Sequence, residues 1–174
     1  MKKLAAPVML AIFLWSCNPA PNTEESVLAQ PQSVEISDAK YIGIGKQGLQ
    51  DISNGNVDGF INSMADNIVY KWNNGDSIVG KDGVAAFWKD RRANVIDTIS
   101  FSNDIWLSVK VNQAENVGPG NYLLGWFDSS ITYATGKTVT MAIHNVYHFD
   151  ANGKIDFVQQ YLDRAPINAA MVKQ

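Results

Sequence analysis

Four strand-like runs joined by short turns fill the second half of the chain, and they constrain its fold more than any other feature. They are rich in β-branched and aromatic residues and cover residues 98–112, 121–135, 137–150 and 154–164. The links between them contain Gly-Pro-Gly, Thr-Gly and Asn-Gly, which are turn sequences. Links this short join neighbouring antiparallel strands. The second half is therefore predicted to form a four-stranded antiparallel meander.

The first half of the folded part reads mainly as helices. Helical spacing of apolar residues predicts helices within residues 37–56, 57–66 and 81–97, and alternation around Asn-Gly predicts a hairpin over 67–80. Three helices followed by a meander give an α+β fold, in which a strongly bent antiparallel sheet wraps around the helices. We expect one domain over residues 38–174.

The N-terminus has the composition of an export signal. A basic start, an apolar run and the ending Leu-Trp-Ser-Cys predict a signal peptide over residues 1–16, and the ending resembles a bacterial lipobox with Cys17 as the lipidated residue. Residues 17–37 are rich in proline and polar residues and are predicted to be a flexible tether. We expect a lipoprotein of the bacterial envelope, at the periplasmic side or outer membrane, held to the membrane only through its lipid anchor.

Charge and motif context exclude several functions. The net charge is −3 without a basic block, which argues against nucleic acid as a partner. Gly-Ile-Gly-Lys-Gln-Gly at residues 43–48 matches a dinucleotide-binding pattern but lacks a preceding apolar strand. His144 and His148 lie four residues apart on one strand, about 13 Å, which is too far for one metal ion. No metal and no cofactor are predicted.

Two segments resemble the nuclear transport factor 2-like superfamily, in its SnoaL-like branch. They are residues 52–92, from "ISNGNVDGFINSMAD" to "KDGVAAFWKDRR", and residues 147–163, "YHFDANGKIDFVQQYLD". The resemblance implies a cone-shaped, cystatin-like fold with an apolar pocket inside, shared by ketosteroid isomerases and polyketide cyclases. It also implies a homodimer formed through the convex sheet face. Such a fold carries many functions, so it does not settle this one.

The last hairpin decides which residues enter the cone. If Asn152 and Gly153 alone form its turn, one face holds His144, Tyr161 and Asp163, and the opposite face follows from strand alternation. A three-residue loop with a bulge at Gly153 would shift these sets by one. The resemblance favours the opposite face as the interior, and the same parity applied to the Thr135-Gly136 turn brings in two further residues. The predicted pocket residues are Tyr70, Trp72, Trp88, Trp126, Asp128, Ile143, Asn145, Val158, Gln160 and Leu162.

The catalytic positions implied by the resemblance mostly hold residues that cannot exchange protons. Those of the isomerases fall on Trp72, Gly48 and Asn145, and those of the cyclases fall on Gln160 and Asn145. We therefore expect a domain that binds a small apolar molecule without catalysis. The alternatives are an isomerase, cyclase or hydrolase and a dimeric interaction module with a filled cone. The enzyme would use Asp128, which burial among aromatic rings would make more basic, or the pair His144 and Asp163.

Overall fold

The computed structural model describes residues 32–172. The predicted signal peptide and the lipidation of Cys17 lie outside these residues. Within them, no helix is both long and apolar enough to cross a bilayer.

Seven strands and four α-helices make up the described part. The strands are β1 (Val34–Ile36), β2 (Met64–Trp72), β3 (Ser77–Val79), β4 (Ile96–Val111), β5 (Gly120–Tyr133), β6 (Thr138–Phe149) and β7 (Ile155–Tyr161). The helices are α1 (Lys40–Ser53), α2 (Val57–Asn62), α3 (Lys81–Asp90), which continues into the π-helical turn η1 (Arg91–Val95), and α4 (Ala165–Met171).

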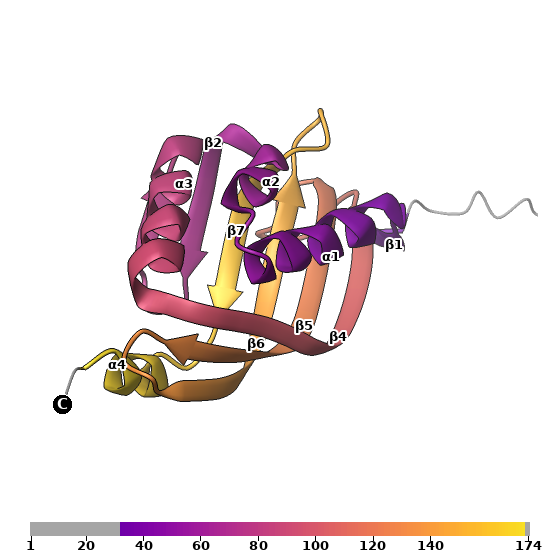
Figure 1. Ribbon diagram of the computed structural model, residues 1–174. Coiled ribbons are helices and arrows are strands. Elements are labelled where there is room, and N and C mark those ends of the chain that lie inside the picture. Colours follow the sequence, from indigo (N-terminus) through magenta and orange to yellow (C-terminus); the bar gives the residue numbers. More distant parts are fainter. Residues whose placement is uncertain (1–31, 173–174) are drawn as a thin grey trace, which may run out of the picture. The chain divides into compact units, whose positions relative to one another are not determined.

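All strands join one bent sheet in the order β1-β4-β5-β6-β7-β2-β3. Helices α1, α2 and α3 lie over the face toward which the sheet bends, and α4 lies near the curled ends of β5 and β6 (Figure 1). This confirms the predicted α+β fold with a bent sheet and three N-terminal helices. Three features were not predicted. Strands β2 and β7 pair in parallel, and α4 follows the last strand. Strand β1, which pairs with β4, lies inside the range 17–37 that was assigned to the tether.

The core lies between the helices and the inner face of the sheet. Ile68, Leu123 and Val158 are fully buried there, on β2, β5 and β7. The strands alternate buried and exposed positions, so each residue's face follows from strand register. Register in the two C-terminal hairpins therefore determines which residues enter the interior.

The hairpin of β6 and β7 reaches the predicted pairing through two compensating irregularities. Its loop has three residues, because the N–H of Asp150 bonds the carbonyl of Lys154 and Gly153 has φ +74°. Of the two loops that the sequence left open, the three-residue one is therefore present, and this loop alone would shift the pairing by one. A bulge at Asp156 adds one residue to β7 and restores it, so Asn145 pairs with Gln160.

The hairpin of β5 and β6 contains the same kind of loop without the compensation. The N–H of Tyr133 bonds the carbonyl of Lys137 and Gly136 has φ +80°, so this loop also has three residues. The register continues without a bulge, which pairs Trp126 with His144. Trp126 and Asp128 therefore lie on the outer face, and the prediction that they point inward is wrong. Phe127 takes the inward position between them and is 3% exposed.

The glycine-rich stretch of α1 has a packing role. A Cβ on Gly45 would lie 2.6 Å from Leu123 Cδ2 and 2.7 Å from Trp106 Cζ3. A Cβ on Gly125, on β5, would lie 2.4 Å from the same Trp106 atom. The indole is therefore held between two glycines, which bring α1 close to the sheet.

Candidate functional site

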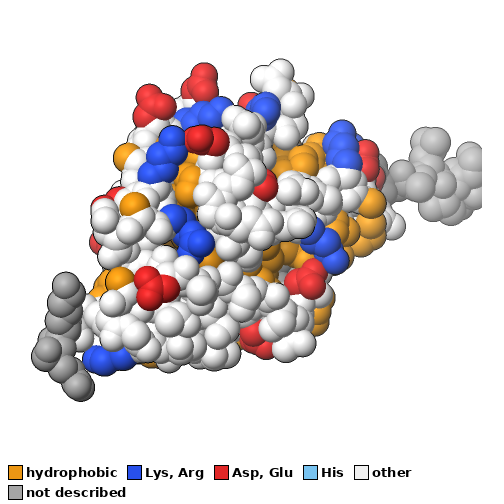
Figure 2. All heavy atoms as spheres, viewed as in Figure 1, with side chains coloured by type: hydrophobic (Ala, Val, Ile, Leu, Met, Phe, Trp, Pro, Cys, Tyr) orange, Lys and Arg blue, Asp and Glu red, His pale blue; other side chains and the backbone are white. Residues whose placement is uncertain are grey.

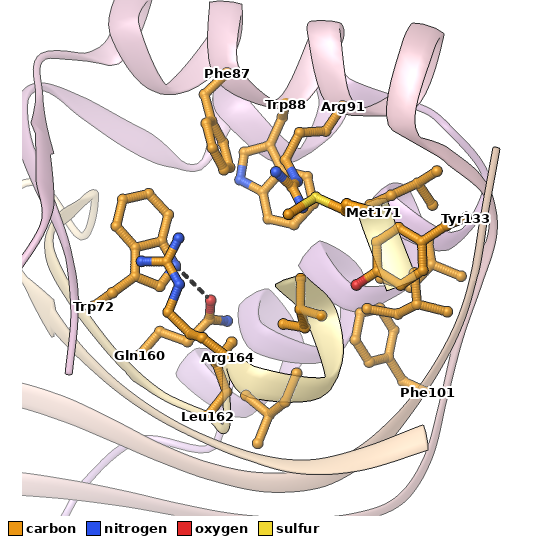
Figure 3. A pocket seen from close by; sticks show the side chains of 15 residues that line it. Trp72, Phe87, Trp88, Arg91, Phe101, Tyr133, Gln160, Leu162, Arg164 and Met171 are labelled. Carbon is orange, nitrogen blue, oxygen red and sulfur yellow. Dashed lines mark hydrogen bonds between the residues drawn. The ribbon is translucent and has the colours of Figure 1, made fainter. Parts of the chain in front are cut away.

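A cavity of about 80 Å³ opens between α3, α4 and the inner face of the sheet. Figure 3 shows its lining side chains pointing toward a common space from several elements. The lining is mainly aromatic and aliphatic, with two arginines, one amide and one phenol as its polar groups. The lining residues are Trp72, Phe87, Trp88, Arg91, Ile96, Ile99, Phe101, Ile131, Tyr133, Ile143, Gln160, Leu162, Arg164, Ile167 and Met171.

A second, smaller space of about 30 Å³ shares Trp88, Phe101 and Gln160 with the first. It lies toward α1 and α2, and aromatic residues make up most of its lining. Its other lining residues are Leu49, Ile52, Phe60, Tyr70, Phe127, Asn145 and Tyr147.

Trp72 and Gln160 form one wall of the cavity. They are register partners in the parallel pairing of β2 and β7. The Trp72 Nε1–H donates to Gln160 Oε1 at 2.9 Å, as drawn in Figure 3. The Trp72 ring packs against Phe87 at 5.2 Å between ring centroids, and the Arg164 guanidinium lies 5.8 Å from the centroid of the Trp72 ring. This wall is thus fixed by a hydrogen bond and by packing on both sides.

Helix α3 and the turn η1 supply the adjoining wall. Phe87, Trp88 and Arg91 line the cavity together because residues three and four apart share a helical face. The turn η1 begins at Arg91, whose carbonyl accepts from the N–H of Ile96, five residues on. Such wide turns occur often at functional sites. The Arg91 guanidinium lies 5.3 Å from the Phe87 centroid, and its Nη2 approaches Met171 Sδ at 3.7 Å.

Buried polar atoms around the two spaces lack hydrogen-bond partners. Among the described residues, Trp88 Nε1, the Tyr133 hydroxyl and Asn145 Oδ1 have none. The Tyr133 residue is only 1% exposed, and its hydroxyl points toward the middle of the cavity in Figure 3. Asn145 uses its Nδ2 to donate to the Tyr147 hydroxyl at 2.7 Å. An unpaired buried polar group costs about 1–3 kcal/mol, so a ligand that pairs with these atoms would recover that energy.

Burial dominates the ionisation of the lining groups. It lowers the pKa of Arg91, and the nearby Arg164 guanidinium lowers it further, while Tyr133 and Asp90 oppose the shift. Burial raises the pKa of Tyr133, against the effect of Arg91. Burial raises the pKa of Tyr147 to about 12 and raises the pKa of Tyr70 still higher. The three phenols are therefore neutral around pH 7.

Most predicted pocket residues lie where they were expected. Trp72, Trp88, Ile143, Gln160 and Leu162 line the larger space, and Tyr70 and Asn145 line the smaller one. Val158 lies on the inner face but is buried in the core. Trp126 and Asp128 are the exceptions, as the β5–β6 register explains.

The weak catalytic candidates occupy the outer face or its edge. Asp128 accepts from Asn103 Nδ2 at 2.8 Å, and the Asp163 carboxylate accepts from the Ala165 N–H at the start of α4. The His144 ring stacks between Trp126 and Tyr161, and its Nδ1 lies 3.0 Å from the Gly125 carbonyl oxygen. These contacts give each group a structural partner outside the cavity. Within residues 32–172, no three metal-binding side chains gather in one place.

Several lining residues were missed by the sequence reasoning. Arg91 occurs at helical spacing with Phe87 and Trp88, so a cation within an apolar stripe was a usable signal. Arg164 and Met171 lie at the two ends of α4. At its start the Asp163 carboxylate accepts from the Ala165 N–H, and a proline stands in the first turn. Tyr133 was assigned to the outer face because the predicted β5–β6 loop was one residue too short.

Comparison with known proteins gives a family match and a shared fold. The profile of the SnoaL-like domain matches residues 47–158. No curated protein matches the chain. Among solved structures, a nuclear transport factor 2-like protein of unknown function from Burkholderia pseudomallei has a TM-score of 0.61 at 14% identity, covering 78% of this chain and 99% of its own.

Two further solved structures carry names of enzymes. A candidate polyketide cyclase from Pseudomonas putida has a TM-score of 0.61 at 13% identity, over 76% of this chain and 98% of its own. A LEH-like epoxide hydrolase from M. tuberculosis has a TM-score of 0.55 at 14% identity, over 76% and 90%. At such identities the likeness concerns the fold alone.

Proposed function

The chain belongs to the SnoaL-like domain family, and on that premise we propose that its cavity binds a small, largely apolar molecule without catalysing a reaction. The observation that carries this proposal is an aromatic and aliphatic cavity with a buried, unpaired Tyr133 hydroxyl directed into it. Small-molecule sites combine apolar walls with a few placed polar groups in the same way.

The size of the cavity limits the ligand. Drug-sized molecules occupy pockets of about 300–1,000 Å³, and an apolar cavity of about 150 Å³ is enough for benzene. The space of about 80 Å³ therefore suits a short aliphatic chain or the apolar end of a longer molecule. Ile167 and Met171 of α4 line one side of this space.

The lining chemistry supports binding over catalysis. Among the described residues, neither space is lined by a carboxylate or an imidazole. The phenols that are present hold their protons more tightly than usual, so they are poorly suited to proton transfer at neutral pH. Some solved relatives in fold are named as enzymes, but the positions that would match their catalytic groups read Trp72, Asn145 and Gln160 here.

Binding of 1-pentanol to the purified protein tests this proposal. Burying about four methylenes contributes about 3 kcal/mol, which corresponds to binding in the millimolar range, and this is measurable by NMR titration. Leu162→Phe should fill the cavity and abolish binding. Leu107→Phe, the same change at an exposed position of β4, should leave binding intact. Equal binding by both variants would contradict the proposed site.

We also propose that the mature protein is a lipoprotein anchored through Cys17 on the periplasmic side of the envelope or on the outer membrane. The support is the order of basic, apolar and Leu-Trp-Ser-Cys segments at the N-terminus. Mass spectrometry of the mature N-terminus should find acyl chains on Cys17. Cys17→Ala should release the protein from membranes, and retention of that variant would contradict the anchor.

The outer face is proposed to join two copies. Trp126 and Tyr161 are 39% and 46% exposed there, although large aromatic side chains are costly to leave in water. Sedimentation should show a dimer that Trp126→Asp converts to a monomer. A monomeric native protein would contradict the proposal.

A further inference from the structure

Three hydrogen-bond donors at one side of the cavity lack a good acceptor. Trp88 Nε1 donates only, and neither it nor the Tyr133 hydroxyl has a partner in the described part of the chain. The Arg91 guanidinium approaches only the Met171 sulfur at 3.7 Å, and a thioether is a weak acceptor. Figure 3 shows all three side chains directed toward the same space. These three donors therefore face the cavity without an acceptor, and a ligand would have to supply one.

Arg91 is also a partly buried charge without a counter-ion. Within residues 32–172, no carboxylate forms a salt bridge with it. The other cavity arginine differs, because Arg164 Nη1 lies 2.8 Å from Asp76 Oδ2. A desolvated cation beside a second cation is unfavourable, and burial together with Arg164 lowers the pKa of Arg91 accordingly. An anion bound at this place would remove both costs.

The geometry points to a ligand that is a small monocarboxylic acid, with its carboxylate held by Arg91, Trp88 and Tyr133 and its apolar chain inside the cavity. This assignment rests on the proposed binding function and names the chemical class that the site takes. A carboxylate has two oxygens with about four acceptor positions, enough for the forked Arg91 guanidinium, the indole N–H and the phenol O–H together.

The other walls fit the rest of such a molecule. Opposite the donors, Trp72 has its N–H already engaged by Gln160 and so presents an apolar ring. Ile99, Ile131 and Ile143 on the sheet continue this apolar surface. A phosphate ester suits the site less well, because a dianion with a bulky headgroup needs more cationic donors than the single free guanidinium.

Pentanoate and 1-pentanol form a matched pair of probes, since they share the alkyl chain and differ in the charged head. Hydrogen bonds to a charged group are strong enough to change affinity by tenfold or more. Pentanoate should therefore bind at least tenfold more tightly than 1-pentanol at pH 7. Arg91→Met keeps the aliphatic stem and removes the charge, and it should remove most of this preference, which is the ratio of the two affinities measured on the same variant.

Lys89→Met is the matched control, because it removes one charge from the same helix at an exposed position paired with Asp58. It should leave the affinities for both probes unchanged. Arg91→Lys keeps the charge but not the fork, and should retain part of the preference. Circular dichroism of each variant confirms that it is folded.

The outcomes separate this inference from the proposed function. Equal affinity of the native protein for both probes would overturn the carboxylate assignment while leaving a binding cavity, and this comparison needs no variant. A preference that survives in Arg91→Met would overturn the role of Arg91. Binding of neither probe would contradict the proposed function itself.

Discussion

Two alanine substitutions in α1 should differ in their effect on the free energy of unfolding. Gly43 and Gly45 lie two residues apart in one helix, but only Gly45 faces the sheet. Replacing glycine with alanine inside a helix stabilises it by about 1 kcal/mol. Nothing lies within 4 Å of a Cβ on Gly43, so Gly43→Ala should show the whole gain.

Gly45→Ala should lose that gain to overpacking. The new methyl group would lie 2.7 Å from Trp106 Cζ3, and Gly125 closes the other side of the ring. The indole is further fixed by its Nε1–H, which donates to Asp104 Oδ2 at 2.6 Å. Overpacking costs about 1–3 kcal/mol, which leaves Gly45→Ala between neutral and about 2 kcal/mol less stable than the native protein.

Urea unfolding followed by circular dichroism measures both variants. The difference in unfolding free energy between Gly43→Ala and Gly45→Ala should be about 1–3 kcal/mol. Because the two changes are chemically identical, effects on the unfolded chain largely cancel. If both variants gained the same stability, the wedging of Trp106 between two glycines would be refuted.

Two more predictions concern groups around the cavity. The pKa of Tyr147 is raised to about 12 by burial against a usual 10.0, so its protonated form stabilises the fold fully below pH 10 and that contribution disappears as pH rises toward 12. Two pKa units correspond to about 3 kcal/mol. Tyr147→Phe should therefore reduce the decrease of unfolding free energy between pH 10 and 12. An unchanged decrease would show that the Tyr147 phenol is exposed to solvent. Lys137 Nζ donates to the carbonyls of Ala169 and Val172 at the end of α4, at 3.1 and 3.2 Å. Lys137→Met should destabilise α4 by about 1 kcal/mol and speed hydrogen exchange at the Asn168 N–H, whereas unchanged protection there would show that the lysine does not hold the helix.

The class of fold was predictable because hydrophobic period and turn spacing are local signals. Alternation in the last strands and helical spacing around Phe87 and Trp88 determined the elements, and the structure has them. The parallel pairing of β2 with β7 was not accessible in the same way. These strands are far apart in sequence, and neither contains a residue pattern that identifies its pairing partner.

The face on which each strand residue lies depends on whether the hairpin loop has two or three residues. Both hairpins end in a glycine with positive φ that a two-residue and a three-residue loop use equally well. In β7, the bulge at Asp156 could have been inferred, because Ile155 and Val158 are both apolar at a spacing that simple alternation forbids. In β5, no comparable signal corrected the loop, and Trp126 and Asp128 were assigned to the wrong face.

The arginines were overlooked because a cation suggests the surface. Arg91 continues the apolar stripe of α3 as the first residue of η1. Only the fold shows that it contacts Met171 of α4 and that no carboxylate among the described residues pairs with it. Charge pattern alone does not distinguish such a residue from a solvated one. The distinction requires the neighbours that packing brings.

NMR spectra of the tryptophan indole N–H groups during a pentanoate titration test the central claim most directly. Trp72 and Trp88 line the cavity, whereas Trp126 lies on the outer face. The account predicts that the Trp72 and Trp88 indole signals shift together with one dissociation constant while the Trp126 signal stays in place. Shifts confined to Trp126, or no shift at the two inner indoles at saturating pentanoate, would contradict a binding site inside the cone.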